Sequence, residues 1–387
     1  MRVLINLLFL TSERLGGSWT YSTQLVKHLT STPGPDRYTV LTNNQAADLL
    51  PVSPIAGERF VLPINAESRF RRIGSELLLL RGVVRKVRAD ILHSTGNTLP
   101  LGAGIPGIVT LHDLQYRHYP ENFSAGRRLY LRSMIPLSLH LATKVICDSE
   151  YTKRDALAAF NIDERKLTVV YAGGLTEDEA VRPHDVERVR ERYHLEGPYL
   201  LSVGSSLPHK NLDRMIQAFD LVAGAVPHRL VIVGPGFSGN SPLSVALSRT
   251  SLEEHDRVRR IGFVPHADLP GLYAAADGLV FPSLFEGFGI PLVEAMECGC
   301  PVICSRAGSL PEIVGDAGML VDPEDVQGFA DAMRRLCLDR ELYSRLQAAG
   351  RLRVDRFSWA RMAEDTRRVY HEVAGIHQPP SGDHSGD

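Results

Sequence analysis

The amino-acid sequence predicts an α/β protein of two doubly wound domains, each with a parallel sheet covered by helices on both faces. Three observations point to this class. The chain of 387 residues is longer than one ordinary domain. Short, nearly continuous apolar segments alternate with amphipathic segments, as in buried parallel strands joined by helices. The charge also differs along the chain, because residues 1–170 hold 21 Lys and Arg against 14 Asp and Glu, whereas the remainder holds 22 against 31.

The expected strands are short and apolar, and the expected helices lie between them. In the first half the strands are residues 3–10, 90–95, 107–113, 144–149 and 166–173. In the second half they are residues 199–205, 229–236, 259–264, 278–283, 301–305 and 318–322. The main helices are expected at residues 20–29, 150–160, 211–224 and 269–276. A first strand suits the N-terminus better than a secretory signal, because the apolar run contains Asn6 and lacks a small-residue cleavage site.

A polar stretch at residues 173–197 separates the two sets of strands and is the expected linker. The first domain is then residues 1–172 and the second is residues 198–355. An amphipathic helix is expected at residues 356–376, followed by a disordered tail at residues 377–387, which has no apolar periodicity. Ligands of open α/β sheets bind beyond the carboxyl ends of the strands, so we expect the site in a cleft between the domains.

Much of the basic excess lies between Ser68 and Asp90. At helical spacing Leu80 and Val84 share an apolar face, and Arg81 and Arg85 lie beside it. A packed helix with a solvated basic rim is the favoured interpretation, and contact with an anionic membrane is the alternative. Since no uncharged stretch is long enough to span a bilayer, we expect a cytoplasmic protein, or one peripheral on the inner face of the membrane. No nucleic-acid partner is expected.

The five cysteines do not predict a disulfide framework, because their number is odd in a long chain. Cys298, Cys300 and Cys304 lie close together, but their spacing does not match the paired CxxC of zinc sites, and no histidine lies among them. We therefore expect buried thiols and no metal site.

Two carboxylates eight residues apart, Glu286 and Glu294, flank the segment EGFGIPLVE at the end of an expected strand. Pro291 suits the first turn of a helix, and the backbone N–H groups from Gly289 to Val293 are expected to be unpaired and to bind an anion such as a diphosphate. A carboxylate can accept two hydrogen bonds from a vicinal diol, so each glutamate suits a sugar. Taken alone, Glu294 is better explained as a favourable charge near a helix N-terminus, and Glu286 as a turn residue.

Other strand-end loops carry further candidates. Lys210 precedes an expected helix, as a cation that opposes phosphate would. Gly16 and Gly17 stand at a helix start and allow close approach of a ligand, although they form no GxGxxG motif. His112 follows another strand and can bond a hydroxyl group. In isolation, a surface lysine and a structural histidine are the alternatives for these positions.

Taken together, these residues make the chain similar to retaining glycosyltransferases of the GT-B fold, in family 4 (glycosyl transferases group 1), which includes bacterial mannosyl-, glucosyl- and rhamnosyltransferases. EGFGIPLVE matches the E-x7-E motif, and CGCPVICSRAGSLPEIVGDAGMLVDPED continues the match. Weaker similarity covers SVGSSLPHKN, GFVPHADLPGLYAAAD and the glycine pair. The resemblance implies two Rossmann-like domains whose parallel sheets face each other across a cleft, the first binding the acceptor and the second the nucleotide sugar.

The resemblance also implies roles for single residues. Glu294 would hold the ribose, Glu286 would face the transferred hexose, and Lys210 would neutralise the departing diphosphate. Many members have Arg-Lys where this chain has His209-Lys210, so phosphate binding would rest more on Lys210, or His209 would contribute when protonated. The expected catalytic residues are Glu286, Lys210 and His112. The expected donor-binding residues are Glu294, Gly16, Gly17, Gly204, His209, Val264, Gly287, Phe288, Gly289 and Ile290.

The implied activity is retaining transfer of a hexose, with mannose preferred, from a GDP- or UDP-linked donor to a saccharide or lipid-linked acceptor in cell-surface polysaccharide synthesis. No cofactor is expected, and the absence of a D-x-D motif agrees with metal independence. A nucleotide-sugar epimerase of the same frame and a non-catalytic sugar-nucleotide binding protein stay open as alternatives. A phosphorylase would need a pyridoxal-bearing lysine and a longer chain, and a dehydrogenase would need a GxGxxG motif.

Overall fold

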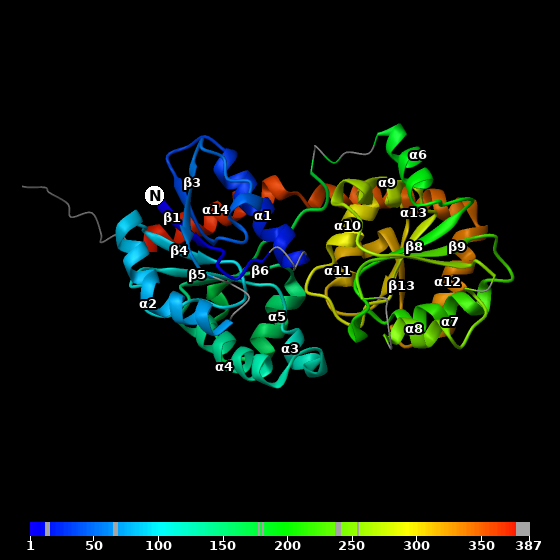
Figure 1. Ribbon diagram of the computed structural model, residues 1–387, viewed down its shortest axis with the longest axis horizontal. Coiled ribbons are helices and arrows are strands. Elements are labelled where there is room, and N and C mark those ends of the chain that lie inside the picture. The colour runs from blue at the N-terminus through cyan, green and yellow to red at the C-terminus, as the bar shows by residue number, and fades with distance from the viewer. Residues whose placement is uncertain are drawn as a thin grey trace, which may run out of the picture. The chain divides into compact units, whose positions relative to one another are not determined.

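The computed structural model describes residues 1–11, 16–64, 69–176, 179, 182–236, 241–253 and 255–376. The chain forms two compact units, shown with their elements in Figure 1. The first contains Met1–Leu114, Ala125–Tyr171 and the residues from Trp359 onward, and the second contains Gln115–Ser124 and Ala172–Ser358. The units therefore do not follow chain order. The expected tail at residues 377–387 lies outside the described residues.

The first unit is built on a parallel sheet of seven strands in the order β3-β2-β1-β4-β5-β6-β7. The strands are β1 (Arg2–Asn6), β2 (Arg37–Asn43), β3 (Gly57–Leu62), β4 (Ile91–Ser94), β5 (Gly107–Leu111), β6 (Lys144–Cys147) and β7 (Leu167–Val169). β4 and β5 are buried along their whole length, as strands covered on both faces are. The sequence analysis missed β2 and β3, because β2 mixes polar with apolar residues and β3 is a largely exposed edge strand.

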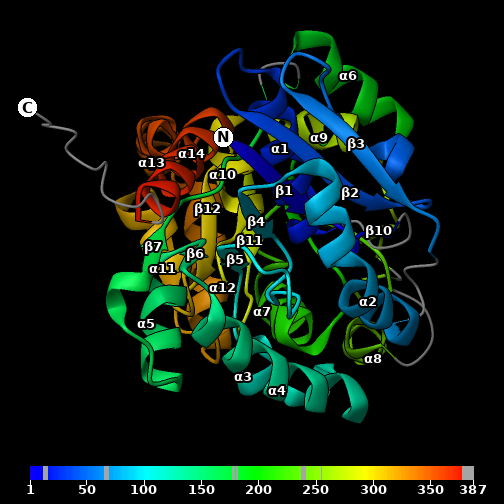
Figure 2. The ribbon, with the colours of Figure 1, turned by 90° about the vertical axis from the view of Figure 1, so that its left-hand side faces the viewer.

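Helices cover both faces of this sheet (Figures 1 and 2). One face carries α1 (Gly17–Ser31) and α14 (Trp359–Ile376), and the other carries α2 (Arg69–Val87), α4 (Ala125–Leu141) and α5 (Glu150–Ala159). Two short 3-10 helices, η1 (Ala47–Leu49) and η3 (Glu164–Lys166), complete the unit. As expected of the basic helix, Leu80 and Val84 of α2 are buried and its arginines at 81 and 85 are exposed.

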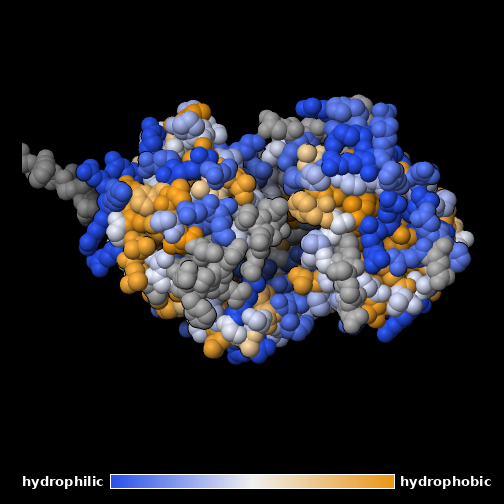
Figure 3. Space-filling view, in the orientation of Figure 1, coloured by the Kyte–Doolittle hydropathy of each residue, from blue (hydrophilic) through white to orange (hydrophobic). Residues whose placement is uncertain are grey.

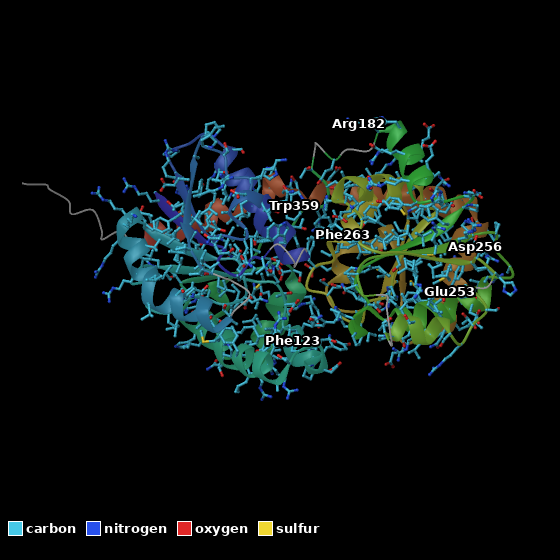
Figure 4. All side chains as sticks on the ribbon, viewed as in Figure 1. Phe123, Arg182, Glu253, Asp256, Phe263 and Trp359 are labelled. Atoms are coloured by element: carbon cyan, nitrogen blue, oxygen red, sulfur yellow. The ribbon has the colours of Figure 1, made fainter. Side chains whose placement is uncertain are left out.

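Buried polar contacts fix α14 to the sheet of the first unit. Figure 4 marks Trp359, where the helix begins. The Tyr370 hydroxyl lies 2.7 Å from His93 Nδ1, and His93 Nε2 lies 2.8 Å from the Thr110 hydroxyl. Burial lowers the pKa of His93 to about 3, so the ring is neutral. The last helix is therefore held by specific hydrogen bonds as well as by apolar packing.

The second unit is built on a parallel sheet of six strands in the order β10-β9-β8-β11-β12-β13. The strands are β8 (Tyr199–Val203), β9 (Arg229–Val233), β10 (Val258–Ile261), β11 (Gly278–Phe281), β12 (Val302–Ser305) and β13 (Gly318–Val321). A core that includes Met215, Phe219, Phe329 and Met333 packs against one face of this sheet. All six strands lie where the sequence predicts them.

The helices of the second unit again form two layers (Figure 1). One layer holds α7 (Leu212–Val222), α8 (Pro242–Leu247) and α12 (Val326–Leu338), and the other holds α9 (Leu269–Ala275), α10 (Ile290–Glu297) and α13 (Arg340–Arg353). The expected linker contributes α6 (Pro183–Arg192), which packs beside α9. The shorter elements are α3 (Gln115–His118), η2 (Pro120–Asn122), η5 (Pro208–Lys210), η6 (His266–Asp268), α11 (Leu310–Val314), η7 (Gly315–Ala317) and η8 (Val354–Arg356).

The cysteines are free thiols, as the sequence predicts. Cys300 and Cys304 are buried and Cys298 is partly buried, and burial raises the pKa of each of these thiols. None of the helices in the described part of the chain combines the length and the apolar character needed to cross a membrane.

Candidate functional site

A half-buried ion pair joins two strand-end loops of the second unit. Lys210 ends η5, which follows β8, and Glu286 lies in the loop after β11. Lys210 Nζ lies 2.5 Å from Glu286 Oε1, and the two side chains are 18% and 16% exposed. Because β8 and β11 are parallel neighbours, their carboxyl ends bring both residues to the same edge of the sheet. The structure thus brings together two of the three expected catalytic residues.

Gly204 leaves β8 beside the lysine. Its φ of +156° favours glycine, and a Cβ at this position would lie 3.8 Å from Lys210 Cδ. A side chain at position 204 would therefore meet the stem of the lysine in van der Waals contact. Gly204, a predicted donor-binding residue, thus lies at the same edge of the second sheet as Lys210 and Glu286.

Gly289 caps the N-terminus of α10 in the left-handed region, with a φ of +104°. A Cβ there would lie 2.9 Å from Leu310 Cδ2, so only glycine fits without a shift. The expectation of an unpaired N–H run from Gly289 to Val293 is wrong: Pro291 has no N–H, and the Leu292 N–H donates to the Gly289 carbonyl at 3.0 Å. An anion at this helix end would meet fewer backbone donors than the sequence suggests.

Glu294 lies beyond the first turn of α10, and not within that turn as the sequence suggested, and it is almost fully buried. The Tyr273 hydroxyl donates to its Oε2 at 2.8 Å, and His266 Nε2 lies 3.8 Å from its Oε1. His266 Nδ1 in turn lies 2.9 Å from Glu179 Oε1. Burial raises the pKa of Glu294, and His266 and Tyr273 oppose this shift. The carboxylate is thus held in one orientation, as an acceptor of hydroxyl groups requires.

His209, beside Lys210, is buried, and Asn122 Nδ2 lies 3.0 Å from its Nδ1. Burial and the Lys210 charge lower the pKa of His209 to about 4, although Glu286 acts in the opposite direction. The ring is therefore neutral near pH 7. This low pKa disfavours a protonated His209 as a source of charge and leaves Lys210 as the cation of this loop.

Two buried hydroxyl groups at the same strand ends have no hydrogen-bond partner among the described residues. Ser206 follows β8 and Ser283 follows β11. Leaving a buried polar group unpaired costs about 1–3 kcal/mol. A polar ligand or water at this edge would satisfy both groups, and sequence reasoning gave no signal for either.

Val264, Phe263 and their neighbours lie in the loop after β10, at a further strand end of the same sheet. Val264 is buried, whereas Phe263, labelled in Figure 4, is exposed. The predicted role of Val264 in donor binding stays a prediction.

In the first unit, Gly17 opens α1, and Gly16 caps it in an extended conformation with a φ of −174°. A Cβ at Gly16 would meet nothing within 4 Å, so the backbone around this helix end is open. This space agrees with close approach of a ligand to the helix N-terminus. The role of the glycine pair remains a prediction.

His112 is more constrained than the sequence suggests. Its Nδ1 lies 2.6 Å from the Asp148 carboxylate, and its Nε2 lies 2.6 Å from the Thr95 carbonyl. Burial would lower the pKa of His112, but Asp148 and the Thr95 carbonyl outweigh it and raise the pKa. Both ring nitrogens therefore donate to protein acceptors. A direct bond from His112 to a hexose would have to replace the contact with Thr95.

Sequence reasoning missed four residues that shape this site. Tyr273, His266 and Glu179 orient Glu294, and Asn122 contacts His209. His266 and Tyr273 share one segment, but Glu179 and Asn122 come from others, and the packing of all four is visible only in three dimensions. Across the described ranges, no group of three or more His, Cys, Asp and Glu side chains is arranged to hold a metal ion.

Two family models match the chain. The model described as Glycosyl transferases group 1 matches residues 185–353, and the model described as Glycosyltransferase Family 4 matches residues 15–174. The first covers Lys210, Glu286 and Glu294, and the second covers Gly16, Gly17 and His112. The matches thus include residues from both units.

Several named relatives of the chain are mannosyltransferases. The chain is 31% identical over 266 residues to the O-antigen chain mannosyltransferase B of Escherichia coli, which is 68% of this chain and 69% of that protein. It is 28% identical over 338 residues to the O-antigen chain mannosyltransferase RfbU of Salmonella typhimurium, which is 84% of this chain and 89% of that protein. The chain is therefore related to bacterial mannosyltransferases along most of its length.

A solved structure shares the fold. The Anabaena protein HepE, in complex with UDP and glucose, aligns with a TM-score of 0.74 at 23% identity over 96% of this chain and 100% of that chain. The two parallel sheets of this chain are thus those of the GT-B fold. From the family models and the relatives together, we conclude that the chain belongs to the glycosyl transferases group 1 enzymes, the retaining glycosyltransferases of family 4.

Proposed function

We propose that the chain transfers a hexose, with mannose preferred, from a GDP- or UDP-linked donor to a saccharide or lipid-linked acceptor in cell-surface polysaccharide synthesis. The observation that carries this proposal is the pairing of Lys210 with Glu286 at one edge of the second sheet. The relatives from Escherichia coli and Salmonella typhimurium are O-antigen chain mannosyltransferases, which favours mannose and an O-antigen-like product. UDP is the nucleotide in the HepE complex, which keeps a UDP-linked donor open.

In the proposed reaction, the bond between the hexose and the diphosphate breaks and negative charge grows on the departing phosphate. Lys210 would stabilise this charge as a fixed cation, without reorganisation and without a metal ion. Glu286 would position the oxocarbenium-like hexose rather than form a covalent intermediate. The acceptor hydroxyl would attack on the face that the phosphate leaves, and a phosphate oxygen would take its proton. Retention follows from attack on that face.

Glu294 would bind the ribose of the donor. Its carboxylate is held by Tyr273 on one oxygen and lies near His266 on the other, so a diol would meet a fixed acceptor. Gly16 and Gly17 would allow close approach of a ligand to the start of α1, and His112 would bond a hydroxyl group of a sugar. For His112, the role would require exchange of its bond to Thr95.

We also propose peripheral contact between the first unit and an anionic membrane on its cytoplasmic side. Leu129, Leu137 and Leu141 of α4 are 69%, 38% and 52% exposed, and Leu78 of α2 is 82% exposed. Figure 3 shows hydrophobic surface over α2. α4 contains three arginines and no acidic residue, so its charge complements anionic lipid. The exposed leucines and the positive charge of α4 favour membrane contact over the alternative of packed helices with a solvated basic rim.

The experiment that tests the proposed function is thermal unfolding of the purified protein with GDP, UDP, dTDP or ADP and their hexose conjugates, with EDTA present. One nucleotide family should raise the melting temperature, because a ligand at one hundred times its Kd stabilises by about 2.7 kcal/mol. The same donor should then be consumed when a saccharide acceptor is added. Binding without turnover would support a sugar-nucleotide binding protein, and conversion of the donor sugar without an acceptor would support an epimerase. Absence of any shift would overturn the donor-site assignment.

A further inference from the structure

One short segment contacts both loops that carry the Lys210–Glu286 pair. It is the stretch Gln115–Ser124, which follows β5 in the chain but belongs to the second unit. The His118 ring stacks on the Phe285 ring with centroids 4.8 Å apart, and the Tyr119 hydroxyl lies 3.4 Å from the Leu284 carbonyl. Phe285 directly precedes Glu286. The segment is therefore anchored on the loop after β11.

The same segment reaches the second loop through Asn122, at the end of η2. Asn122 Nδ2 lies 3.0 Å from His209 Nδ1. An amide nitrogen can only donate, so Nδ1 must be the acceptor, and the neutral ring then carries its proton on Nε2. The Leu284 N–H also donates to the His209 carbonyl at 2.7 Å, which ties the two loops to each other. Figure 4 marks Phe123, the residue that follows η2.

The charges around His209 favour this neutral form. Lys210 faces the ring from its own loop, and Glu286 faces it from the loop after β11. Burial and Lys210 lower the pKa of His209 to about 4. A protonated ring would donate from both nitrogens, so it would lose the bond from Asn122 and would stand as a second cation beside Lys210.

We propose that Asn122 is a positioning residue for the donor site: its amide fixes His209 as the neutral Nε2–H tautomer, so that Lys210 supplies the cation and His209 a neutral donor. This inference rests on the proposed donor site. This chain has His209-Lys210 where many family members have Arg-Lys. A histidine held in this way gives the loop a directed N–H donor but no second positive charge. The segment Gln115–Ser124 would thereby set the geometry of both donor loops.

The direct test is histidine-selective ¹⁵N NMR of the full-length protein, with the His209 signals identified by their loss in His209→Gln. In the wild type, His209 should show the Nε2–H tautomer and should not titrate from about pH 5 to 8. In Asn122→Asp, the carboxylate cannot donate to Nδ1 and favours a proton there, so the ring should titrate within that range. Asn161→Asp, the same change at an exposed asparagine, should leave His209 unaltered.

A second variant and an activity readout keep the proposal falsifiable if Asn122→Asp folds poorly. Asn122→Ala removes the donor without adding charge, and it should yield a mixture of the two neutral tautomers. With the donor found by thermal unfolding, Asn122→Asp should lower kcat by about tenfold and change the KM of the donor by less than about threefold. In a His209→Arg background, Asn122→Asp should cause no further loss of kcat, because the new carboxylate can pair with the arginine.

Two results would overturn the proposal. One is an unchanged His209 tautomer and titration in both Asn122 variants. The other is an equal loss of kcat from Asn122→Asp in the wild-type and His209→Arg backgrounds, because Asn122 would then act independently of residue 209. The NMR measurement needs no substrate, so a protein that lacks nucleotide binding but shows the expected His209 behaviour would contradict the donor site and not the Asn122–His209 contact.

Discussion

Lys210 Nζ and Glu286 Oε1 lie 2.5 Å apart, so the cation proposed to meet the diphosphate and the carboxylate proposed to face the hexose form an ion pair with each other. Each side chain fixes the orientation of the other at the edge of the second sheet. Removing either one leaves a half-buried charge without its partner. Substitutions at this pair should therefore alter both catalysis and the local electrostatics.

Lys210→Ala should lower turnover by about two to three powers of ten, as the loss of other preorganised charge-stabilising donors does. The affinity for the bare nucleoside diphosphate should fall by less, because the lysine is proposed to act mainly on charge that develops during bond breaking. Steady-state kinetics with the identified donor, and calorimetric titration with the nucleotide, measure the two effects. Lys166→Ala, at a partly buried lysine of the first unit whose Nζ donates to the His140 carbonyl, is the control and should retain normal turnover. Near-normal turnover of Lys210→Ala would show that another group neutralises the leaving diphosphate.

Glu294→Gln should weaken the binding of the nucleotide and of the nucleotide sugar by the same factor, because both carry the ribose that the carboxylate is proposed to hold. The amide keeps the shape of the side chain but replaces one acceptor oxygen with a donor. Tyr273→Phe removes only the 2.8 Å bond to Oε2 and should have a smaller effect in the same direction. Titration of each variant with both ligands gives the comparison. Unaltered affinities in Glu294→Gln would remove this residue from the ribose role.

Much of the fold follows from the sequence because the central strands of a parallel sheet are apolar throughout. β5, β8, β9 and β11 are visible for this reason. β2 and β3 are not, since β2 interleaves polar side chains and β3 is solvent-exposed at the sheet edge. The membership of Gln115–Ser124 in the second unit could not be predicted either, because it depends on side-chain stacking such as that of His118 on Phe285.

Site residues could be predicted where their position follows from the strand that precedes them. They could not be predicted where their state depends on packing against distant parts of the chain. Glu286 and Lys210 lie in the loops that follow two neighbouring parallel strands, so their convergence follows from the parallel sheet. The neutral state of His209 depends on burial and on Asn122, which lies 87 residues away in the chain. The two hydrogen bonds of His112, one to Asp148 and one to Thr95, likewise depend on residues at three separate strand ends.

The membrane proposal predicts that exposed leucines of α4 are needed for lipid binding. The wild type should co-sediment with vesicles of phosphatidylglycerol and phosphatidylcholine, and binding should weaken with added salt. Leu129→Gln combined with Leu137→Gln should reduce it severalfold, because the loss of buried apolar area weakens insertion. The matched control is Leu338→Gln with Leu352→Gln, at leucines of the second unit that are 55% and 75% exposed. If the wild type fails to bind these vesicles, α2 and α4 are packed helices with a solvated rim.

The contact of His266 with Glu179 and Glu294 predicts a pH-dependent contribution to stability. The hydrogen bond to Glu179 raises the pKa of His266 above its ordinary value of about 6.5, although burial opposes the shift. The folded state therefore binds this proton more tightly than the unfolded state. The resulting stabilisation is fully present below about pH 6.5 and is lost as the pH rises through the folded-state pKa.

His266→Gln should accordingly lower the free energy of unfolding by less than about 1 kcal/mol at acidic pH, since water screens a side chain that is 43% exposed. The difference from the wild type should shrink at alkaline pH, where the imidazole is neutral and the ion pair with Glu179 is gone. Urea unfolding at about pH 5.5 and 8.5, on either side of the ordinary histidine pKa, measures this difference. His140→Gln, at an exposed histidine of α4, should show no such dependence. An equal difference at both pH values would mean that His266 acts through packing and not through its charge.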